Sequence, residues 1–185
     1  MEQDYITETK ISGVFIIERP IIADGRGFFR ETFRIPELEK RTGYTFVPQQ
    51  ANHSRSSKNT LRGIHIAPWN KLVTCTSGLI QQIIVDTRPN SPTFGEYFTT
   101  LIGEDNWRSV LIPADCGNAF LVLSDTADYS YLVTQTWTAG KERDLIWNDP
   151  TIKIEWLTEN PEISEKDSRA QTLTGLFPEK FLQNE

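Results

Sequence analysis

Residues 72–86 read Leu-Val-Thr-Cys-Thr-Ser-Gly-Leu-Ile-Gln-Gln-Ile-Ile-Val-Asp, which is two apolar runs joined by a Ser-Gly pair. The runs cover residues 72–76 and 79–86 and contain several β-branched side chains. Short runs of this kind, bounded by turn residues, are typical of β-strands, and a glycine between two of them indicates a tight turn. We therefore predict two strands joined as a hairpin.

The same pattern recurs along the chain, whereas helical signals are few. Residues 35–41 favour a short helix with Pro36 in its first turn, and residues 178–183 favour another. Many short strands separated by turn residues predict a sandwich or barrel rather than a parallel sheet with crossover helices. We expect one all-β domain over residues 1–185, with a few short helices. Further strands are predicted at residues 14–17, 28–33, 96–102, 109–112, 119–123 and 129–136.

Composition excludes several classes of partner. The chain has 185 residues, of which 38% are hydrophobic and 24% charged, as in ordinary globular domains. Its net charge of -6 argues against nucleic acid, which favours a basic surface. A small anionic ligand remains possible because it needs only a few arginines and lysines. No apolar run approaches a membrane span and no secretory signal is evident, so we expect a cytoplasmic protein.

Few residues are available for metal or disulfide chemistry. Cys75 and Cys116 lack the spacing of a disulfide framework and are expected to be packed thiols. The only histidines are His53 and His65, whereas a metal centre needs several convergent ligands. We therefore expect neither a metal nor another cofactor.

His65 ends the stretch Leu-Arg-Gly-Ile-His at residues 61–65. If this stretch is extended, Leu61, Gly63 and His65 share one face, while Arg62 and Ile64 share the other. His65 then projects into the interior, where histidine is suited to accept a proton near neutral pH. A hydrogen-bonded structural histidine fits the same position, and the residues alone leave both interpretations open.

Four further polar residues are each open to two interpretations. Arg26 lies in Asp-Gly-Arg-Gly, residues 24–27, which predicts either a plain turn or a guanidinium held against a phosphate. Lys71 precedes an apolar strand and either covers a surface edge or points inward. Tyr131 alternates with Tyr129 on one strand face, where packing is the commoner role. Asp167 follows Ser-Glu-Lys, which is typical of a solvated charge run or a helix start.

Together these segments resemble the dTDP-4-dehydrorhamnose 3,5-epimerase family, a branch of the cupin-like jelly rolls that works without metal. The resemblance extends from about residue 13 to residue 173. Its order and spacing are specific, although no single segment decides it. The segments that carry it are residues 24–33, 50–54, 61–65, 71–73, 85–88, 91–95, 120–124, 147–150 and 163–167.

The resemblance implies an epimerase that inverts C3, C5 or both in a nucleotide-linked 4-keto sugar of the dTDP-4-dehydro-6-deoxyglucose type. It implies that His65 is the base, oriented by Asp167. In the same way Lys71 stabilises the enolate oxygen, and Tyr131 is the general acid. It also implies contacts with the nucleotide or diphosphate for Arg26, Phe28, Glu31, Gln50, Asn52, Arg62 and Trp137.

The chemistry explains these residue types. A hydrogen beside a ketone is acidic only when the enolate is stabilised, so a base and a donor at the ketone oxygen are both needed. Inversion then needs a proton delivered to the opposite face. Family members are typically dimers that exchange N-terminal strands, which implies that Phe28 and Glu31 serve the neighbouring subunit's site.

The sequence departs from the family around the sugar pocket. Asn118 stands where a histidine is common, and it can hydrogen-bond to the sugar but cannot relay a proton at neutral pH. Residues 66–70 form a shorter segment than usual, and Leu132 replaces a frequent lysine. Two alternatives therefore stay open: inversion of one carbon only, or another substrate such as a GDP-4-keto-heptose. Outside the enzyme class, the fold also suits a non-catalytic sugar-binding module.

Overall fold

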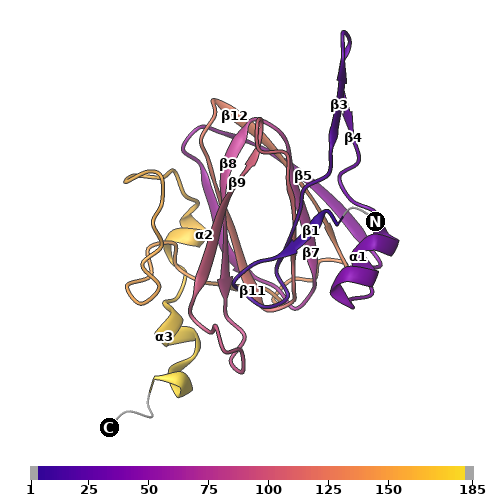
Figure 1. Cartoon of the computed structure of the whole chain (residues 1–185). Helices are drawn as coiled ribbons and strands as arrows, with labels where there is room; N and C mark the ends of the chain where they lie inside the picture. Colours follow the sequence, from indigo (N-terminus) through magenta and orange to yellow (C-terminus); the bar gives the residue numbers. More distant parts are fainter. Residues whose placement is uncertain (1–3, 182–185) are drawn as a thin grey trace.

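The structure, a computed structural model, describes residues 4–181 and contains two antiparallel sheets that face each other (Figure 1). In spatial order, the six-stranded sheet contains β1 (Ile6–Glu8), β2 (Phe15–Ile17), β10 (Ser109–Ile112), β7 (Lys71–Ser77), β12 (Thr126–Val133) and β5 (Gln50–Ser57). The five-stranded sheet contains β13 (Arg143–Asp144), β6 (Leu61–Ile66), β11 (Cys116–Val122), β8 (Leu79–Asp86) and β9 (Tyr97–Gly103). The predicted all-β fold is confirmed.

The main core lies between the sheets and is built by alternate side chains. Val73 and Tyr129 reach it from the six-stranded sheet, and Ile80, Ile84 and Phe120 from the five-stranded sheet. Successive strand residues point to opposite faces, so this set defines the inward face of each strand. The rings of Phe120 and Tyr129 stack with their centroids 4.2 Å apart.

The C-terminal segment covers the outer face of the five-stranded sheet. There Ile64 and Ile83 pack against Leu145 and Leu173 in a second buried cluster. Asp149 anchors the segment, because its carboxylate accepts a hydrogen bond from the backbone of Leu173 at 2.7 Å. This segment contains α2 (Glu165–Ser168), α3 (Leu173–Leu176) and a 3₁₀ turn at Pro178–Lys180. It thereby brings α2 close to β6.

The prediction of a hairpin over residues 72–86 is wrong. β7 pairs with β10 and β12, whereas β8 pairs with β9 and β11, so Gly78 carries the chain from one sheet to the other. Both strands are apolar toward the same core, and each is therefore most stable in a different layer of the sandwich. Gly78 has a φ of 75° and lies against the Thr126 carbonyl. A crossing between sheets and a hairpin turn both favour a glycine, so the sequence pattern does not distinguish the two connections.

Other predicted elements are close to the observed ones. The helix expected at residues 35–41 is α1 (Ile35–Thr42), which ends at Gly43. The tail helix is shorter than predicted, and residues 182 and 183 lie outside the described residues. The strand expected at residues 28–33 is limited to β4 (Gly27–Arg30). No helix within residues 4–181 is long and apolar enough to cross a membrane.

β3 (Ile21–Asp24) and β4 form a hairpin that projects from the sandwich (Figure 1). Its turn is the predicted one, since the Asp24 carboxylate accepts from the Arg26 backbone at 2.9 Å. Large apolar side chains on both strands lie in solvent: Ile22 is 65% exposed and Phe29 is 63% exposed. The hairpin is therefore a large apolar surface without a core of its own.

A register shift in β6 corrects the predicted assignment of faces. His65 pairs with Asn118 on β11, but three residues earlier Arg62 pairs with Phe120, only two residues further along β11. β6 thus holds one extra residue, as in a β-bulge. Arg62 and His65 consequently lie on the same inward face, whereas strict alternation predicted opposite faces. Gly63 sits in this bulge with a φ of 119°, and a Cβ there would lie 2.6 Å from the Asn118 carbonyl oxygen.

The sheet crossing at Gly78 can be tested against a matched glycine. Gly140 has a similar φ of 78° but open space around its Cα, whereas a Cβ on Gly78 would meet the Thr126 carbonyl oxygen at 2.1 Å. Gly140→Ala should cost about 1–2 kcal/mol of unfolding free energy, from the left-handed backbone alone. Gly78→Ala should cost about 1–3 kcal/mol more, from overpacking. Urea unfolding of both variants measures the difference, and equal losses would contradict the close approach.

Candidate active site

The centre of the site is a hydrogen bond between His65 on β6 and Asp167 on α2. His65 Nε2 lies 2.9 Å from Asp167 Oδ1. Asp167 is buried and held from its backbone, because its N–H donates to the Ser164 hydroxyl that caps α2. Of the two interpretations left open for this segment, the structure has the helix start at Ser164, and it positions the aspartate beside the histidine.

The charge of Asp167 determines which ring nitrogen is free. Burial raises the pKa of Asp167, but the hydrogen bond from His65 and the attraction to that ring outweigh it, so the pKa lies below its ordinary value. Asp167 is thus a carboxylate that can only accept a hydrogen bond, and Nε2 of His65 must be the donor. In the neutral ring this leaves Nδ1 as the free lone pair, available to take a proton.

A second carboxylate lies beside the same histidine. Asp144 on β13 is the register partner of His65, with Oδ1 3.8 Å from His65 Nε2 and 2.8 Å from Lys166 Nζ. His65, Asp144 and Asp167 offer ligand atoms within 4.8 Å of one another, the spacing of a metal site. Asp144 already has a positive charge beside it from Lys166, and His65 and Asp167 already hydrogen-bond to each other. These contacts therefore disfavour binding of a metal ion by the three residues.

Lys71 begins β7 and points inward, which decides between its two interpretations. Only 5% of the residue is exposed, and its Nζ lies 3.8 Å from the Glu142 carboxylate. Burial lowers the pKa of Lys71, and the charge of Glu142 offsets part of this effect. A buried ammonium beside one carboxylate is a cation with donors available to a ligand.

Tyr131 lies on the inward face of β12, in the sheet opposite to that of His65. It pairs with Asn52 on β5, and its ring packs 5.8 Å from that of Tyr129. Burial raises the pKa of Tyr131, Glu142 adds to the shift, and Arg62 opposes it. The phenol therefore keeps its proton at neutral pH, as a general acid requires.

A cavity of about 250 Å³ opens next to Tyr131. Its polar wall is ordered, since Gln50 donates to Asn52 at 2.7 Å and accepts from the Trp137 backbone at 2.8 Å. The Trp137 indole in turn donates to Glu142 at 3.2 Å. Three residues predicted to contact the nucleotide thus lie together. The lining residues are Gln50, Asn52, Trp69, Tyr131, Val133, Trp137 and Glu142.

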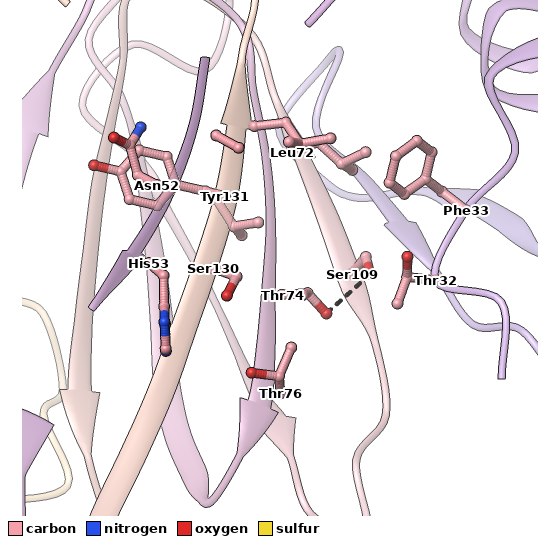
Figure 2. Close-up of a pocket in the computed structure, with 13 residues that line it drawn as sticks. Thr32, Phe33, Asn52, His53, Leu72, Thr74, Thr76, Ser109, Ser130 and Tyr131 are labelled. Carbon is pink, nitrogen blue, oxygen red and sulfur yellow. Dashed lines mark hydrogen bonds between the residues drawn. The ribbon is translucent and has the colours of Figure 1, made fainter. Parts of the chain in front are cut away.

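A second hollow, of about 420 Å³, lies on the outer face of the six-stranded sheet (Figure 2). Figure 2 shows Thr74 and Ser109 on its floor and Phe33 at its edge, whereas the side chains of Asn52 and Tyr131 lie on the other side of the strands. The floor residues alternate with the inward Val73 and Tyr131, so this hollow faces away from His65.

Three predicted contact residues lie away from the His65 site within one chain. The Arg26 side chain is 90% exposed and forms an ion pair with Asp24 in the hairpin turn. The ring of Phe28 lies against that of Trp107, with ring centroids 5.0 Å apart. Glu31 binds Arg19 and Arg34 at the base of the hairpin. The structure therefore does not bring these three residues to the His65 site within one chain.

Comparison with known proteins matches this arrangement. A sequence profile of the dTDP-4-dehydrorhamnose 3,5-epimerase family matches residues 8–175. The dTDP-4-dehydrorhamnose 3,5-epimerase of Escherichia coli K12 is 39% identical over 182 residues, covering 96% of this chain and 98% of that protein. The chain belongs to the dTDP-4-dehydrorhamnose 3,5-epimerase family.

Two solved structures of related epimerases have the same fold. One is a dTDP-6-deoxy-D-glucose-3,5-epimerase from Legionella pneumophila bound to dTDP-4-keto-L-rhamnose, with TM-score 0.88, 35% identity and 95% coverage of both chains. The other is a 3'-monoepimerase from Streptomyces bikiniensis bound to dTDP-quinovose, with TM-score 0.85 and 31% identity, covering 90% of this chain and 86% of that one. The predicted family is confirmed.

Within this candidate site, several residues escaped prediction. Glu142 and Asp144 belong to the run Lys-Glu-Arg-Asp at residues 141–144, which is indistinguishable in sequence from a solvated charge run. Lys166 directly precedes Asp167 and could have been found from that neighbour. Gln82 lies in an apolar strand, where a glutamine among isoleucines was the available signal.

The hydrogen bond to His65 makes Asp167 a source of stability that depends on pH. Because the folded pKa of Asp167 is depressed, its contribution is present above the unfolded pKa and is lost as pH falls through the folded pKa. Asp167→Asn should therefore cost about 1.5–3 kcal/mol near pH 7 and progressively less in acid. Urea unfolding across pH checks this, with the exposed Asp125→Asn as a control that changes little. A penalty independent of pH would contradict the assignment.

Proposed function

We propose that this epimerase acts on a dTDP-linked 4-keto-6-deoxy sugar and inverts C3, C5 or both through an enolate. The observation that carries the proposal is the pair formed by His65 and Asp167, which faces Tyr131 across the interior of the sandwich. A base on one wall and a protonated phenol on the other are what removal and return of a proton on opposite faces require.

In the first step, His65 Nδ1 takes the proton from the carbon beside the ketone, and the C–H electron pair moves into the enolate. Asp167 holds Nε2–H at 2.9 Å and stabilises the imidazolium that forms. The buried ammonium of Lys71 offers a positive charge to the oxygen that becomes negative. In the second step, Tyr131 gives its proton to the opposite face of that carbon.

The nucleotide end of the substrate is proposed to occupy the cavity beside Tyr131. Gln50, Asn52 and Trp137 are linked by hydrogen bonds along its wall, and Trp137 is 56% exposed, so its ring is free to stack on a base. The inward Arg62, held at 2.9 Å to Ser56 Oγ, fits a diphosphate between base and sugar. The related structures that bind dTDP-linked sugars support a ligand of this kind.

Inversion of a single carbon remains the alternative within this chemistry. The related 3'-monoepimerase has the same fold at 31% identity, so fold alone does not separate the two activities. Asn118, in place of the family's frequent histidine, lies directly opposite His65 and alters the sugar pocket. A GDP-linked heptose is the other substrate to be compared.

Solvent exchange tests the proposal directly. The protein is incubated in D₂O with dTDP-4-keto-6-deoxyglucose, and in parallel with a GDP-linked 4-keto sugar, and deuterium at C3 and C5 is measured by NMR. Label at both carbons of the dTDP-sugar is expected, and label at one carbon would identify a mono-epimerase. His65→Asn should slow exchange by about 10²-fold or more, whereas His53→Asn, on the outer face, should retain it. No exchange with either sugar would refute the epimerase.

We further propose a homodimer in which the β3–β4 hairpin reaches the neighbouring subunit. The exposed Ile22 and Phe29 need apolar cover, and the hollow on the outer face of the six-stranded sheet adjoins the end of the hairpin at Thr32 and Phe33. Exchange of hairpins would carry Arg26, Phe28 and Glu31 to the partner's site. We also infer a cytoplasmic location, which suits the free buried thiols Cys75 and Cys116.

Mixing two inactive variants tests the shared site. If Arg26 serves the neighbour, a dimer of Arg26→Ala and His65→Asn contains one site with both defects and one intact site. An equal mixture that exchanges subunits should therefore recover about a quarter of wild-type exchange activity. The matched control mixes His65→Asn with Asp167→Asn, whose defects lie in the same site, and should recover none. A monomer by light scattering, or no recovery in the first mixture, would contradict the proposal.

A further inference from the structure

Asn118 lies beside the proposed base and is part of a buried polar network. It is the register partner of His65 on the neighbouring strand, and only 9% of it is exposed. On β8, Gln82 is fully buried next to it, and Tyr129 approaches both from the opposite sheet. These neutral groups occupy the inward face, where an apolar core would otherwise be expected, so the network needs an explanation.

Backbone carbonyls determine which atoms of the network donate and which accept hydrogen bonds. Gln82 Nε2 lies 2.9 Å from the Ala119 oxygen and 3.1 Å from the Ile83 oxygen, and a carbonyl can only accept. The side-chain atom of Gln82 that faces these two carbonyl oxygens must therefore be its amide nitrogen. The same nitrogen lies 2.7 Å from the side chain of Asn118, which must then present its oxygen to Gln82. The orientation of both amides follows from hydrogen bonding alone.

Tyr129 completes the network and leaves one donor unused. Its hydroxyl donates to Gln82 Oε1 at 3.0 Å and lies 3.3 Å from Asn118 Oδ1. The oxygen of Asn118 thus faces Gln82 and Tyr129, while its Nδ2 has no hydrogen-bond partner among residues 4–181. Among the fully buried side-chain nitrogen and oxygen atoms of residues 4–181, only Arg19 Nε lacks a hydrogen-bond partner. Asn118 Nδ2 lacks one too, so it is not fully buried and is accessible to a ligand.

We propose that Asn118 Nδ2 donates a hydrogen bond to the sugar oxygen that becomes negative in the enolate, and that Gln82 is the positioning residue that fixes this donor. The inference rests on the proposed epimerase function. The carbon that loses its proton is bonded to the carbon that carries this oxygen, so base and donor must be neighbours. Residues directly opposite in an antiparallel pair have Cβ atoms about 4.5–5.5 Å apart, which suits His65 and Asn118.

This arrangement differs in kind from a histidine at the same position. An amide held by Gln82 is a donor at every working pH and never competes with His65 for the substrate proton. Asn118 and the Lys71 ammonium would then divide the stabilisation of the oxyanion between a neutral and a charged donor. His65 is left as the only imidazole on the inward face of the described strands.

Three isosteric substitutions test the proposal in the D₂O exchange assay with dTDP-4-keto-6-deoxyglucose. Asn118→Asp keeps the acceptor toward Gln82 but removes the free donor. Gln82→Glu removes the N–H groups that hold the Asn118 oxygen. The matched control is Gln81→Glu, because Gln81 is equally buried on the outer face of the same strand, where it binds the Glu155 carbonyl oxygen and the Leu157 N–H at 2.9 Å each.

We expect kcat to fall by about 10²–10³-fold in Asn118→Asp, the usual cost of one lost oxyanion donor, with KM changed only a few-fold. Gln82→Glu should lower kcat in the same direction, and Gln81→Glu should leave it near wild type. Circular dichroism and dTDP binding by calorimetry confirm that each variant is folded. Should Gln82→Glu fail to fold, Asn118→Ala replaces it as the second variant and is expected to match Asn118→Asp.

The outcomes separate this inference from the function on which it rests. Absence of exchange in the wild-type protein would refute the epimerase itself. Exchange in the wild type with kcat unchanged in Asn118→Asp would overturn the donor role and leave the function intact. An equal fall in kcat for Gln81→Glu and Gln82→Glu would overturn the positioning role, since the loss would then reflect a buried charge in β8.

Discussion

The site depends on one register shift, the extra residue that β6 accommodates at Gly63. Strict alternation would put Arg62 and His65 on opposite faces of the sheet, with one of them outside the sandwich. The bulge returns both to the inward face, and only glycine fits where the strand approaches the Asn118 carbonyl oxygen. A basic side chain and an imidazole thereby share the inward face of β6, as the proposed contacts with a diphosphate and its sugar require.

Everything else in the site is arranged around that shift. The C-terminal segment, anchored by Asp149, delivers α2 and the Asp167 carboxylate to the ring of His65. The opposite sheet supplies Tyr131 and Lys71, both buried far enough that the pKa of the phenol rises and that of the ammonium falls. Two facing sheets thus place the proposed acid and the proposed base on opposing walls.

Much of this was accessible from sequence, because short β-branched runs, the Pro36 helix and the Ser164 cap are local signals. The bulge was not, since pairing between β6 and β11 joins residues more than fifty positions apart. The crossing at Gly78 was misread as a hairpin for the same reason. Glu142 and Asp144 looked like surface charges, because only the tertiary fold turns them toward Lys71 and His65.

The proposed chemistry depends on Asp167 accepting a hydrogen bond from His65 Nε2–H, which leaves Nδ1 as the base. Nitrogen-15 NMR of the histidine ring in the free protein, at a pH where the ring is neutral, reports the tautomer directly. We expect a protonated Nε2 and an unprotonated Nδ1 for His65, with the resonance of the unprotonated nitrogen shifting on addition of a dTDP-sugar. A protonated Nδ1, or a ring that averages between tautomers, would contradict it.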